Sequence, residues 1–169
     1  KEASKLASSS SAFLAGGMTS VPSMKLGLAT YKDIIDIKHI KKLSGIKVSG
    51  KSVTIGATTK HVDVATSKEV KKAIPSLAKL AGGIGDAQVR NRGTVGGSIA
   101  NNDPSACYPS ACMALNAIIH TNNRKIEASK FFKGMFETAL KKGELIEAIE
   151  FKIPEKSSYQ KHPNPASRY

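Results

Sequence analysis

The sequence of 169 residues has no tryptophan, few aromatic side chains and only two cysteines. Aromatic residues make up 5% of the chain, so we expect a core built mainly from aliphatic side chains. No apolar run reaches the roughly 18 residues that a membrane-spanning helix needs. Cys107 and Cys112 lack the spacing of a C-x-x-C metal or redox pair. So few cysteines favour a reducing compartment, which predicts a cytoplasmic protein.

Acidic residues are also scarce, with 13 Asp and Glu against 26 Lys and Arg, for a net charge of +13. Such an excess is typical of nucleic-acid-binding proteins. The lysines, however, are spread along the whole chain, and few aromatic side chains lie between them to stack on bases. We therefore expect a solvated basic surface, or one that attracts an anionic ligand or an acidic partner subunit. Nucleic-acid binding stays as a disfavoured alternative.

A chain of this length forms one domain or two small ones. Near the N-terminus, short strands at residues 12–15 and 33–37 alternate with helical pieces, a pattern that indicates a small parallel unit. The helical spacing that starts at His61 ends at the Gly82–Gly83 pair, as expected of a helix C-terminus. Further elements are expected as a hairpin at 48–55, a helix at 108–116, strands at 117–120, 125–128 and 144–153, and a short helical stretch from 131. The whole pattern predicts the α+β class.

Two glycine-rich segments, AGGMTS at 15–20 and TVGGS at 94–98, carry the clearest chemical signal. Glycine lacks a Cβ, so its backbone N–H can approach an anion closely, and successive N–H groups form a nest for phosphate oxygens. Either pair alone could equally form a tight turn. Neither follows G-x-G-x-x-G or G-x-x-x-x-G-K-[ST], which argues against a Rossmann site or a P-loop. The two segments together predict a long phosphate-bearing ligand, held by backbone from two sides.

The charged residues near these segments give weaker signals. Arg90 and Arg92 could each pair with a phosphate or a partner subunit, or one of them pins the loop to the following helix, for which Arg92 is the better candidate. The histidines show no metal-ligand spacing and are expected at the surface: His39, His61, His120 and His162. We assign no catalytic acid or base and no metal ligand.

Both glycine segments, with their context, resemble one family. The runs AGGMTSVPSMK and IGDAQVRNRGTVGGS are similar, in the same order, to motifs of the flavin subunits of molybdenum hydroxylases. That family includes carbon monoxide dehydrogenase medium chains and the flavin domain of xanthine dehydrogenases. The runs NDPSACYPSACMALNA and FFKGMFETALKKGELIEAIEFKIP also resemble it, so the likeness spans nearly the whole chain.

This resemblance implies FAD as cofactor and an FAD-binding fold of the vanillyl-alcohol-oxidase (PCMH) type. That fold has a small parallel βαβ-like subdomain and a larger subdomain with a mixed or antiparallel sheet and helices. The corresponding boundaries are 1–56 for the N-terminal FAD-binding subdomain and 57–156 for the second. Residues 157–169 would form a linker to a C-terminal domain that relatives carry. Relatives extend beyond both ends of this sequence, which we therefore expect to be truncated.

The resemblance also implies where FAD binds, in a site between the two subdomains. The first glycine segment would wrap the pyrophosphate, and the second would hold the pyrophosphate and ribityl chain from the other side. Apolar residues would pack on the flavin or adenine, and Cys107 takes the position of a carboxylate that binds the cofactor in relatives. The implied cofactor-binding residues are Leu14, Ala15, Gly16, Gly17, Met18, Thr19, Ser20, Ile84, Val89, Thr94, Val95, Gly96, Gly97, Ser98, Asn102, Asp103, Cys107, Ile146 and Lys161.

The implied function is that of an FAD-dependent oxidoreductase subunit that relays electrons. Substrate is oxidised at a molybdenum centre on a molybdopterin-containing large subunit, and a [2Fe–2S] small subunit passes the electrons to FAD and then to an external acceptor. The chain would belong to a hetero-oligomer without nucleic acid or a membrane span. The alternative is a truncated, non-catalytic assembly fragment that no longer retains FAD, which the substitution at Cys107 favours.

Overall fold

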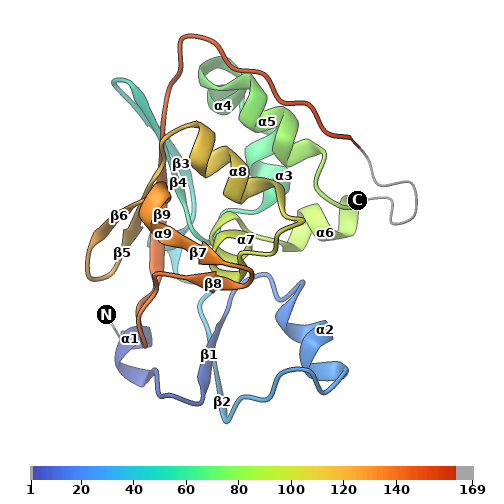
Figure 1. Ribbon diagram of the computed structural model, residues 1–169, viewed down its shortest axis with the longest axis vertical. Coiled ribbons are helices and arrows are strands. Elements are labelled where there is room, and N and C mark those ends of the chain that lie inside the picture. Colours follow the sequence, from blue (N-terminus) through green and yellow to red (C-terminus); the bar gives the residue numbers. More distant parts are fainter. Residues whose placement is uncertain (1, 163–169) are drawn as a thin grey trace.

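The computed structural model of the protein describes residues 2–162. Its N-terminal part is a small unit, in which two short strands lie side by side and parallel, as the alternating pattern predicted. One helix precedes this pair and another connects its strands. The unit lies apart from the larger sheet (Figure 1). Its elements are α1 (Glu2–Leu6), β1 (Ser11–Leu14), α2 (Ser20–Lys25) and β2 (Asp33–Asp36).

The larger part is built on a five-stranded antiparallel sheet with the order β3-β4-β9-β5-β6. Its strands are β3 (Ile46–Ser49), β4 (Ser52–Gly56), β5 (Ile118–Thr121), β6 (Lys125–Glu127) and β9 (Ile146–Lys152). The hairpin β3–β4 therefore belongs to this sheet, although a boundary at residue 56 would place it in the N-terminal unit. The reason is that Val53 and Ile55 on β4 are fully buried and lie opposite Phe151 and Ile149 on β9.

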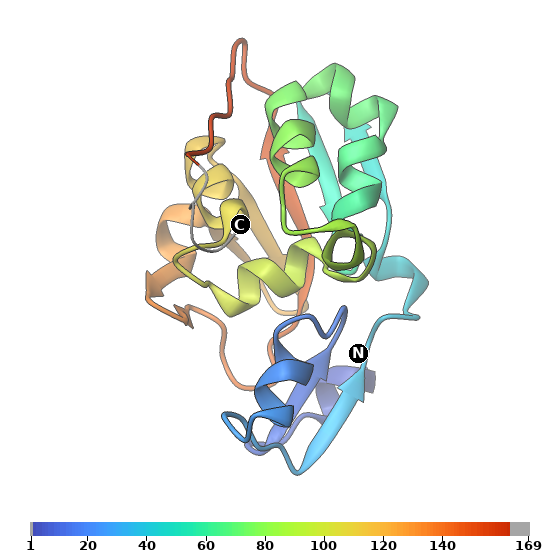
Figure 2. The same cartoon turned by 90° about the vertical axis from the view of Figure 1, so that its right-hand side faces the viewer.

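Helices cover one face of this sheet, and Figure 2 shows them in front of it. They are α3 (His61–Thr66), α4 (Lys68–Ala73), α5 (Pro75–Gly82), α6 (Ala87–Arg92), α7 (Val95–Asn101) and α8 (Cys107–Ala114). A 3-10 turn, η1 (Lys41–Leu43), joins the two parts of the chain. The stretch expected to be helical from Phe131 is instead the end of α9 (Ala128–Phe131), followed by the hairpin β7 (Phe132–Gly134) and β8 (Glu137–Thr138).

The main hydrophobic core lies between the sheet and the helices, and most of its side chains are aliphatic, as the composition predicted. Tyr108, Phe131 and Phe151 are its largest fully buried members. A smaller cluster of Ile37, Leu43 and Leu145 joins the N-terminal unit to the larger part. This second cluster fixes how the two parts face each other.

Residues after β9 run back across the helical layer (Figure 1). Tyr159 packs against the main core, and the Ser157 and Ser76 hydroxyls are hydrogen-bonded at 2.6 Å. The tail thus contacts α5. Within residues 2–162, every helix is too short or too polar to cross a bilayer.

Candidate functional site

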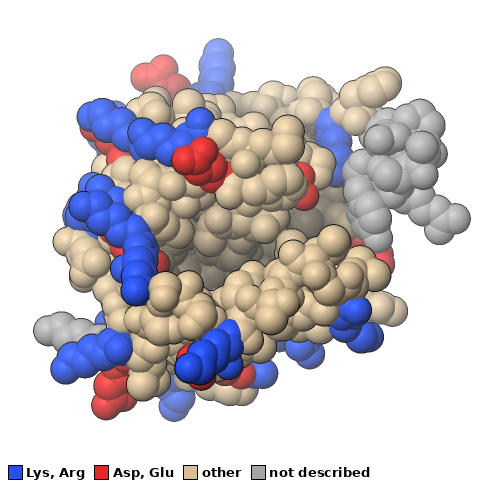
Figure 3. Space-filling view, turned by 60° about the horizontal axis from the view of Figure 1, so that its bottom comes forward, with Lys and Arg blue, Asp and Glu red and all other residues tan. Residues whose placement is uncertain are grey.

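A cleft of about 500 Å³ lies between the N-terminal unit and the larger part. Figure 3 shows the hollow near the middle of one face, with Lys and Arg side chains around its margin. The predicted cofactor residues that line it are Ala15, Gly16, Gly17, Met18, Thr19, Ser20, Ile84, Val89, Thr94, Gly96, Gly97, Ser98, Asp103 and Ile146. Both glycine segments therefore reach one cleft, as their pairing in the sequence predicted.

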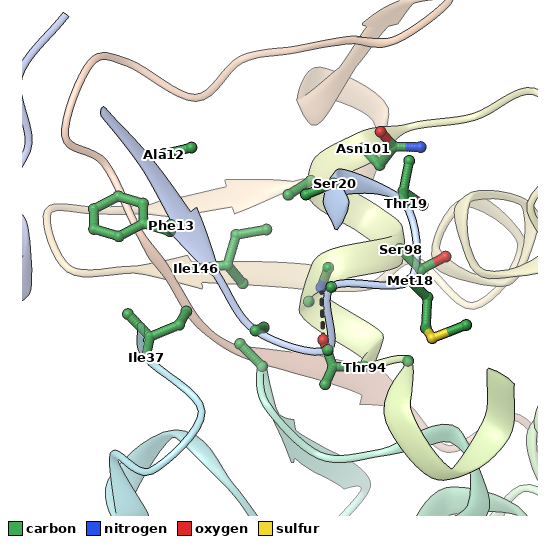
Figure 4. A pocket seen from close by; sticks show the side chains of 18 of the residues that line it. Ala12, Phe13, Met18, Thr19, Ser20, Ile37, Thr94, Ser98, Asn101 and Ile146 are labelled. Atoms are coloured by element: carbon green, nitrogen blue, oxygen red, sulfur yellow. Dashed lines mark hydrogen bonds between the residues drawn. The ribbon is translucent and has the colours of Figure 1, made fainter. Parts of the chain in front are cut away.

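The first glycine segment forms a loop between β1 and α2, and its backbone donors are free. Within the described part of the chain, the N–H groups of five successive residues, Gly16 to Ser20, have no protein acceptor. Two hydroxyls, of Thr19 and Ser20, lie on the same loop, and Figure 4 shows it beside the start of α7. A run of free N–H groups of this kind fits the oxygens of a phosphate.

Two glycines shape this loop for different reasons. A Cβ on Gly16 would lie 2.1 Å from the carbonyl oxygen of Arg92 and 3.0 Å from the Cα of Gly93, so only glycine lets the loop rest on that segment. Gly17 has φ +74°, in the left-handed region that side chains rarely adopt. The contact at Gly16 brings the two glycine segments together at the floor of the cleft.

The second glycine segment is a helix start and not a nest of free donors, which corrects the prediction for residues 94–98. The Thr94 hydroxyl caps α7 by accepting the N–H of Gly97 at 3.2 Å, the bond dashed in Figure 4. The N–H of Gly96 donates to the carbonyl of Ala57 at 2.8 Å, and that of Ser98 to the carbonyl of Thr94 at 3.0 Å. These donors are already used within the protein, so this segment offers a ligand its shape and the Ser98 hydroxyl.

Its glycines still have clear roles in packing. A Cβ on Gly96 would lie 2.6 Å from the Cβ of Ala57, so a side chain there would push α7 away from the end of β4. Gly97 lines the cleft and leaves its wall open. Val95 is fully buried beneath this wall, so it supports the site from inside the core.

Four other predicted residues lie outside the lining. Asn102 has φ +45° at the end of α7, and its side-chain amide donates to the carbonyls of Gly134 and Glu137 at 2.7 and 2.9 Å. It therefore holds the β7–β8 hairpin. The remaining three are Leu14 at the end of β1, Cys107, which packs against the main core, and Lys161, whose ammonium lies 3.4 Å from the carbonyl oxygen of Gly83.

The arginine that pins the loop is Arg90, where the sequence had favoured Arg92. One guanidinium nitrogen of Arg90 donates to the carbonyls of Ile84 and Gly85, at 3.0 and 2.8 Å. Gly85 has φ +49°, so a left-handed turn presents both carbonyls to the same side chain. Ile84 is thereby held in the cleft lining.

Several lining residues were not predicted from the sequence: Ala12, Phe13, Tyr31, Ile37, Ala57, His61, Gly93, Ala100, Asn101, Ala106, Leu140, Glu144 and Leu145. His61 is the clearest difference, because we expected it at the surface and it is 4% exposed. A signal was available, since His61 and Val64 are three residues apart and both face the core side of α3.

Glu144 is a buried carboxylate at the edge of the cleft, and the protein satisfies it fully. It accepts hydrogen bonds at 2.8 Å from Arg124 Nε, from the Thr121 hydroxyl and from the N–H of Lys141. The hydrogen bond from Arg124, aided by those from Lys141 and Thr121, lowers the pKa of Glu144 to about 2 despite burial. The ion pair fixes the segment that carries Leu145 and Ile146 into the cleft wall.

Charge in the lining is sparse. Among the described lining residues there is no lysine or arginine, and the charged side chains are Asp103 and Glu144. A phosphate in this cleft would therefore depend on backbone N–H groups and hydroxyls. No three His, Cys, Asp or Glu side chains within residues 2–162 are placed to share a metal ion.

Comparison with known proteins identifies relatives of this chain. The family model described as "FAD binding domain in molybdopterin dehydrogenase" matches residues 1–155. The glyceraldehyde dehydrogenase medium chain of Sulfolobus acidocaldarius is 38% identical over 162 residues, which cover 92% of this chain and 58% of the relative. The carbon monoxide dehydrogenase medium chain of Hydrogenophaga pseudoflava is 39% identical over 145 residues, 83% of this chain and 50% of the relative.

Solved structures share the fold. Carbon monoxide dehydrogenase from Hydrogenophaga pseudoflava, in a form that lacks the Mo-pyranopterin moiety, matches with a TM-score of 0.87 and 38% identity, covering 90% of this chain and 55% of that chain. Quinoline 2-oxidoreductase from Pseudomonas putida 86 matches with a TM-score of 0.84 and 30% identity, over 86% and 53%. This chain spans about half the length of the relatives it matches.

Proposed function

Because this chain belongs to the family of FAD-binding domains in molybdopterin dehydrogenases, we propose that its cleft holds FAD and that it acts as the electron-transferring flavin part of a molybdenum hydroxylase. FAD is the cofactor of this family, and the fold is its PCMH-type FAD-binding fold. The proposal is that of a carbon monoxide dehydrogenase-like oxidoreductase subunit. Both glycine segments of the chain line the cleft in which FAD would lie.

The observation that carries the proposal is the run of free backbone N–H groups from Gly16 to Ser20. FAD has a pyrophosphate, whose oxygens accept hydrogen bonds, and donors in successive residues suit such a group. The absence of lysine and arginine from the described lining makes these N–H groups the main source of recognition. A cleft of about 500 Å³ is also within the range usual for cofactor sites, about 300–1,000 Å³.

The rest of the lining suits the two ring systems of the cofactor. Phe13, Ile37 and Ile146 lie near one another in the cleft (Figure 4), and Ile84 and Val89, at the turn before α6 and on α6, also line it. Apolar walls of this kind bury flat rings, while a few polar groups set their orientation. We propose that these two groups of apolar residues take the isoalloxazine and the adenine, with the pyrophosphate at the first glycine loop.

FAD supplies the redox chemistry, accepting electrons and delivering them to an acceptor. The chain's own residues bind it, orient it and exclude water, so no catalytic acid or base is needed here. We propose that the electrons come from a [2Fe–2S] small subunit, which receives them from a molybdopterin-containing large subunit. The similar proteins are named as medium chains, which agrees with a place in such a hetero-oligomer.

The test is reduction of bound flavin by the proposed partner. The chain is loaded with FAD and mixed without oxygen with a reduced [2Fe–2S] small subunit of the family, while flavin absorbance is followed. Loss of the oxidised-flavin bands at a rate that rises with partner concentration is the expected result. A flavin that stays oxidised would contradict the relay. A folded chain that retains no FAD would instead support the assembly-fragment alternative.

A further inference from the structure

His61 is a buried polar side chain at the floor of the cleft, and the binding residues assigned so far do not include it. It begins α3, and its backbone N–H donates to the carbonyl of Gly93 at 3.0 Å. The residue is 4% exposed and lines the cleft beside Gly93. The imidazole is therefore shielded from bulk water on most sides while remaining next to the space that a ligand would fill.

Neither ring nitrogen of His61 has a hydrogen-bond partner in residues 2–162. Nδ1 is fully buried and unpaired. Nε2 lies against Gly93, where a Cβ would come within 2.6 Å of it, so a side chain at 93 would displace the ring. The Tyr108 ring packs on the imidazole, with centroids 5.4 Å apart. A buried polar group without a partner costs free energy, and a ligand that supplies one would recover it.

The position of the ring suggests which part of a ligand it meets. Gly93 touches both His61 and Gly16, since a Cβ on Gly16 would lie 3.0 Å from the Cα of Gly93. The imidazole thus lies close to the base of the loop with the free N–H groups. The ligand atoms expected there are the negatively charged oxygens of a pyrophosphate, and a histidine N–H is a suitable donor to them.

Burial, and not a neighbouring charge, leaves the ring neutral when the cleft holds no anion. Burial lowers the pKa of His61 to about 4, and no neighbouring charge contributes to that shift. Other charged or titratable side chains lie on α3 and on the helices packed against it. Those on or next to α3 are Lys60 and Asp63, and those on α4 are Lys68, Glu69, Lys71 and Lys72. The others are Lys79 on α5, Arg90 and Arg92 on α6, and Cys107, Tyr108 and Cys112 on α8. Of these, Tyr108 is the one whose ring is in contact with the imidazole.

We propose that His61 is a further FAD-binding residue, whose Nε2 donates a hydrogen bond to a pyrophosphate oxygen, and that cofactor binding is coupled to uptake of a proton by this ring. This inference rests on the proposed FAD site. Among the described lining residues, His61 is the one side chain that can become positively charged. It would supply the cation that the cleft otherwise lacks.

The pH dependence follows from the two states of the ring. A nearby anion favours the charged form and raises the pKa of His61 above its value in the empty cleft. A group with a higher pKa in the complex strengthens binding as pH falls through that value. If binding restores the ordinary histidine pKa of 6.5, FAD affinity rises roughly 25-fold between pH 7.5 and pH 5.

The test is calorimetric titration of the chain with FAD, in two buffers of different ionisation enthalpy at pH 5.5, which counts the protons taken up. His61→Gln keeps an amide donor near the Nε2 position but cannot titrate. We expect it to bind FAD within about threefold of the wild type at pH 7.5 and to take up no proton. His61→Leu removes the donor and is expected to weaken binding about tenfold or more.

The control is His120→Gln, because His120 pairs with Glu150 at 2.9 Å on the sheet and lies outside the cleft lining. It should keep both the affinity and the proton uptake of the wild type. Wild-type binding without proton uptake, together with unchanged affinity in His61→Leu, would overturn this inference and leave the FAD site intact. A wild type that binds no FAD would overturn both. If His61→Leu does not fold, the proton count of His61→Gln decides.

Discussion

At the residue scale, Gly16 is where the two glycine segments touch, and one added carbon would separate them. The Cβ of alanine would lie 2.1 Å from the carbonyl oxygen of Arg92, which is backbone and cannot rotate away. We expect Gly16→Ala to lower the free energy of unfolding by about 2 kcal/mol and to weaken FAD binding at least about tenfold. Urea unfolding and titration with FAD measure the two effects.

The matched control is Gly82→Ala, at the end of α5, where the nearest atom to a new Cβ is 3.8 Å away. That variant should be neutral or slightly more stable, because alanine is the better helix former. Equal stability and affinity of both variants would show that the contact at Gly16 does not shape the cleft.

Glu144 has a fully buried side chain, paired with the partly exposed Arg124. We expect Glu144→Gln to lower the free energy of unfolding by about 2–3 kcal/mol at pH 7, which is less than the effect of breaking a fully buried pair. The pKa of Glu144 is about 2 in the folded chain and 4.5 ordinarily. Its contribution is therefore complete above pH 4.5 and is lost as pH falls toward 2.

Chemical unfolding of both proteins at several pH values measures this difference. Glu147→Gln serves as the comparison, since Glu147 pairs with Lys42 at the surface and should contribute less than about 1 kcal/mol. The ion pair would not be the cause if the wild type and Glu144→Gln differed in free energy of unfolding by the same amount at pH 3 and at pH 7.

The sequence predicted residues of the site best where they lie in one glycine segment. The roles of Gly16 and Gly17 could be predicted because the absence of a Cβ is itself visible in the sequence. His61 and Glu144 were missed, since their roles depend on Gly93 and Arg124, which come from distant parts of the chain. Asn102 was predicted as a cofactor-binding residue, and its amide donates to the carbonyls of a hairpin more than thirty residues away, a contact that the sequence did not indicate.

At the scale of elements, the start of α7 depends on its cap. The Thr94 hydroxyl accepts the N–H of Gly97, and no other bond to that N–H occurs within residues 2–162. We expect Thr94→Ala to lower the free energy of unfolding by about 1 kcal/mol and Thr94→Ser to restore most of it, because serine is an equally good cap. Thermal or urea unfolding measures both. A serine variant as unstable as the alanine variant would place the effect in the lost methyl group.

The link between α7 and the β7–β8 hairpin gives another prediction at this scale. Asn102→Ala removes two hydrogen bonds to the hairpin. The backbone amides of the hairpin should therefore exchange with solvent faster than those of the five-stranded sheet. Asn102→Gly removes the same bonds but relieves the strain of φ +45°. Native-state hydrogen exchange tests the link: both variants should lose hairpin protection, with the glycine variant the more stable of the two, and unchanged protection in both would contradict it.

Element prediction succeeded where a local pattern was strong, as in β9, whose alternating residues place Ile149 and Phe151 in the core. It failed near Phe131, where two aromatic residues in succession fit a helix or a strand equally well. The structure resolves this by ending α9 at Phe131 and starting β7 at Phe132. It also failed at Thr94, where the same residues fit either a phosphate-binding loop or the capped start of a helix.

At the scale of the whole molecule, the pairing of β4 with β9 joins residues nearly one hundred positions apart. A single sequence gives no measure of such pairing, and this is why a boundary at residue 56 separated β4 from its own sheet. The placement of the N-terminal unit also depends on distant contacts, through the cluster of Ile37, Leu43 and Leu145. The cleft between the two parts is a product of this arrangement.

We propose that this cleft, with its free loop N–H groups, holds FAD. The most direct measurement is the flavin absorbance of the purified chain after incubation with FAD and removal of the excess, beside Gly16→Ala treated in the same way. We expect close to one flavin retained per wild-type chain and much less in the variant. A folded wild-type chain that retains no flavin would contradict it.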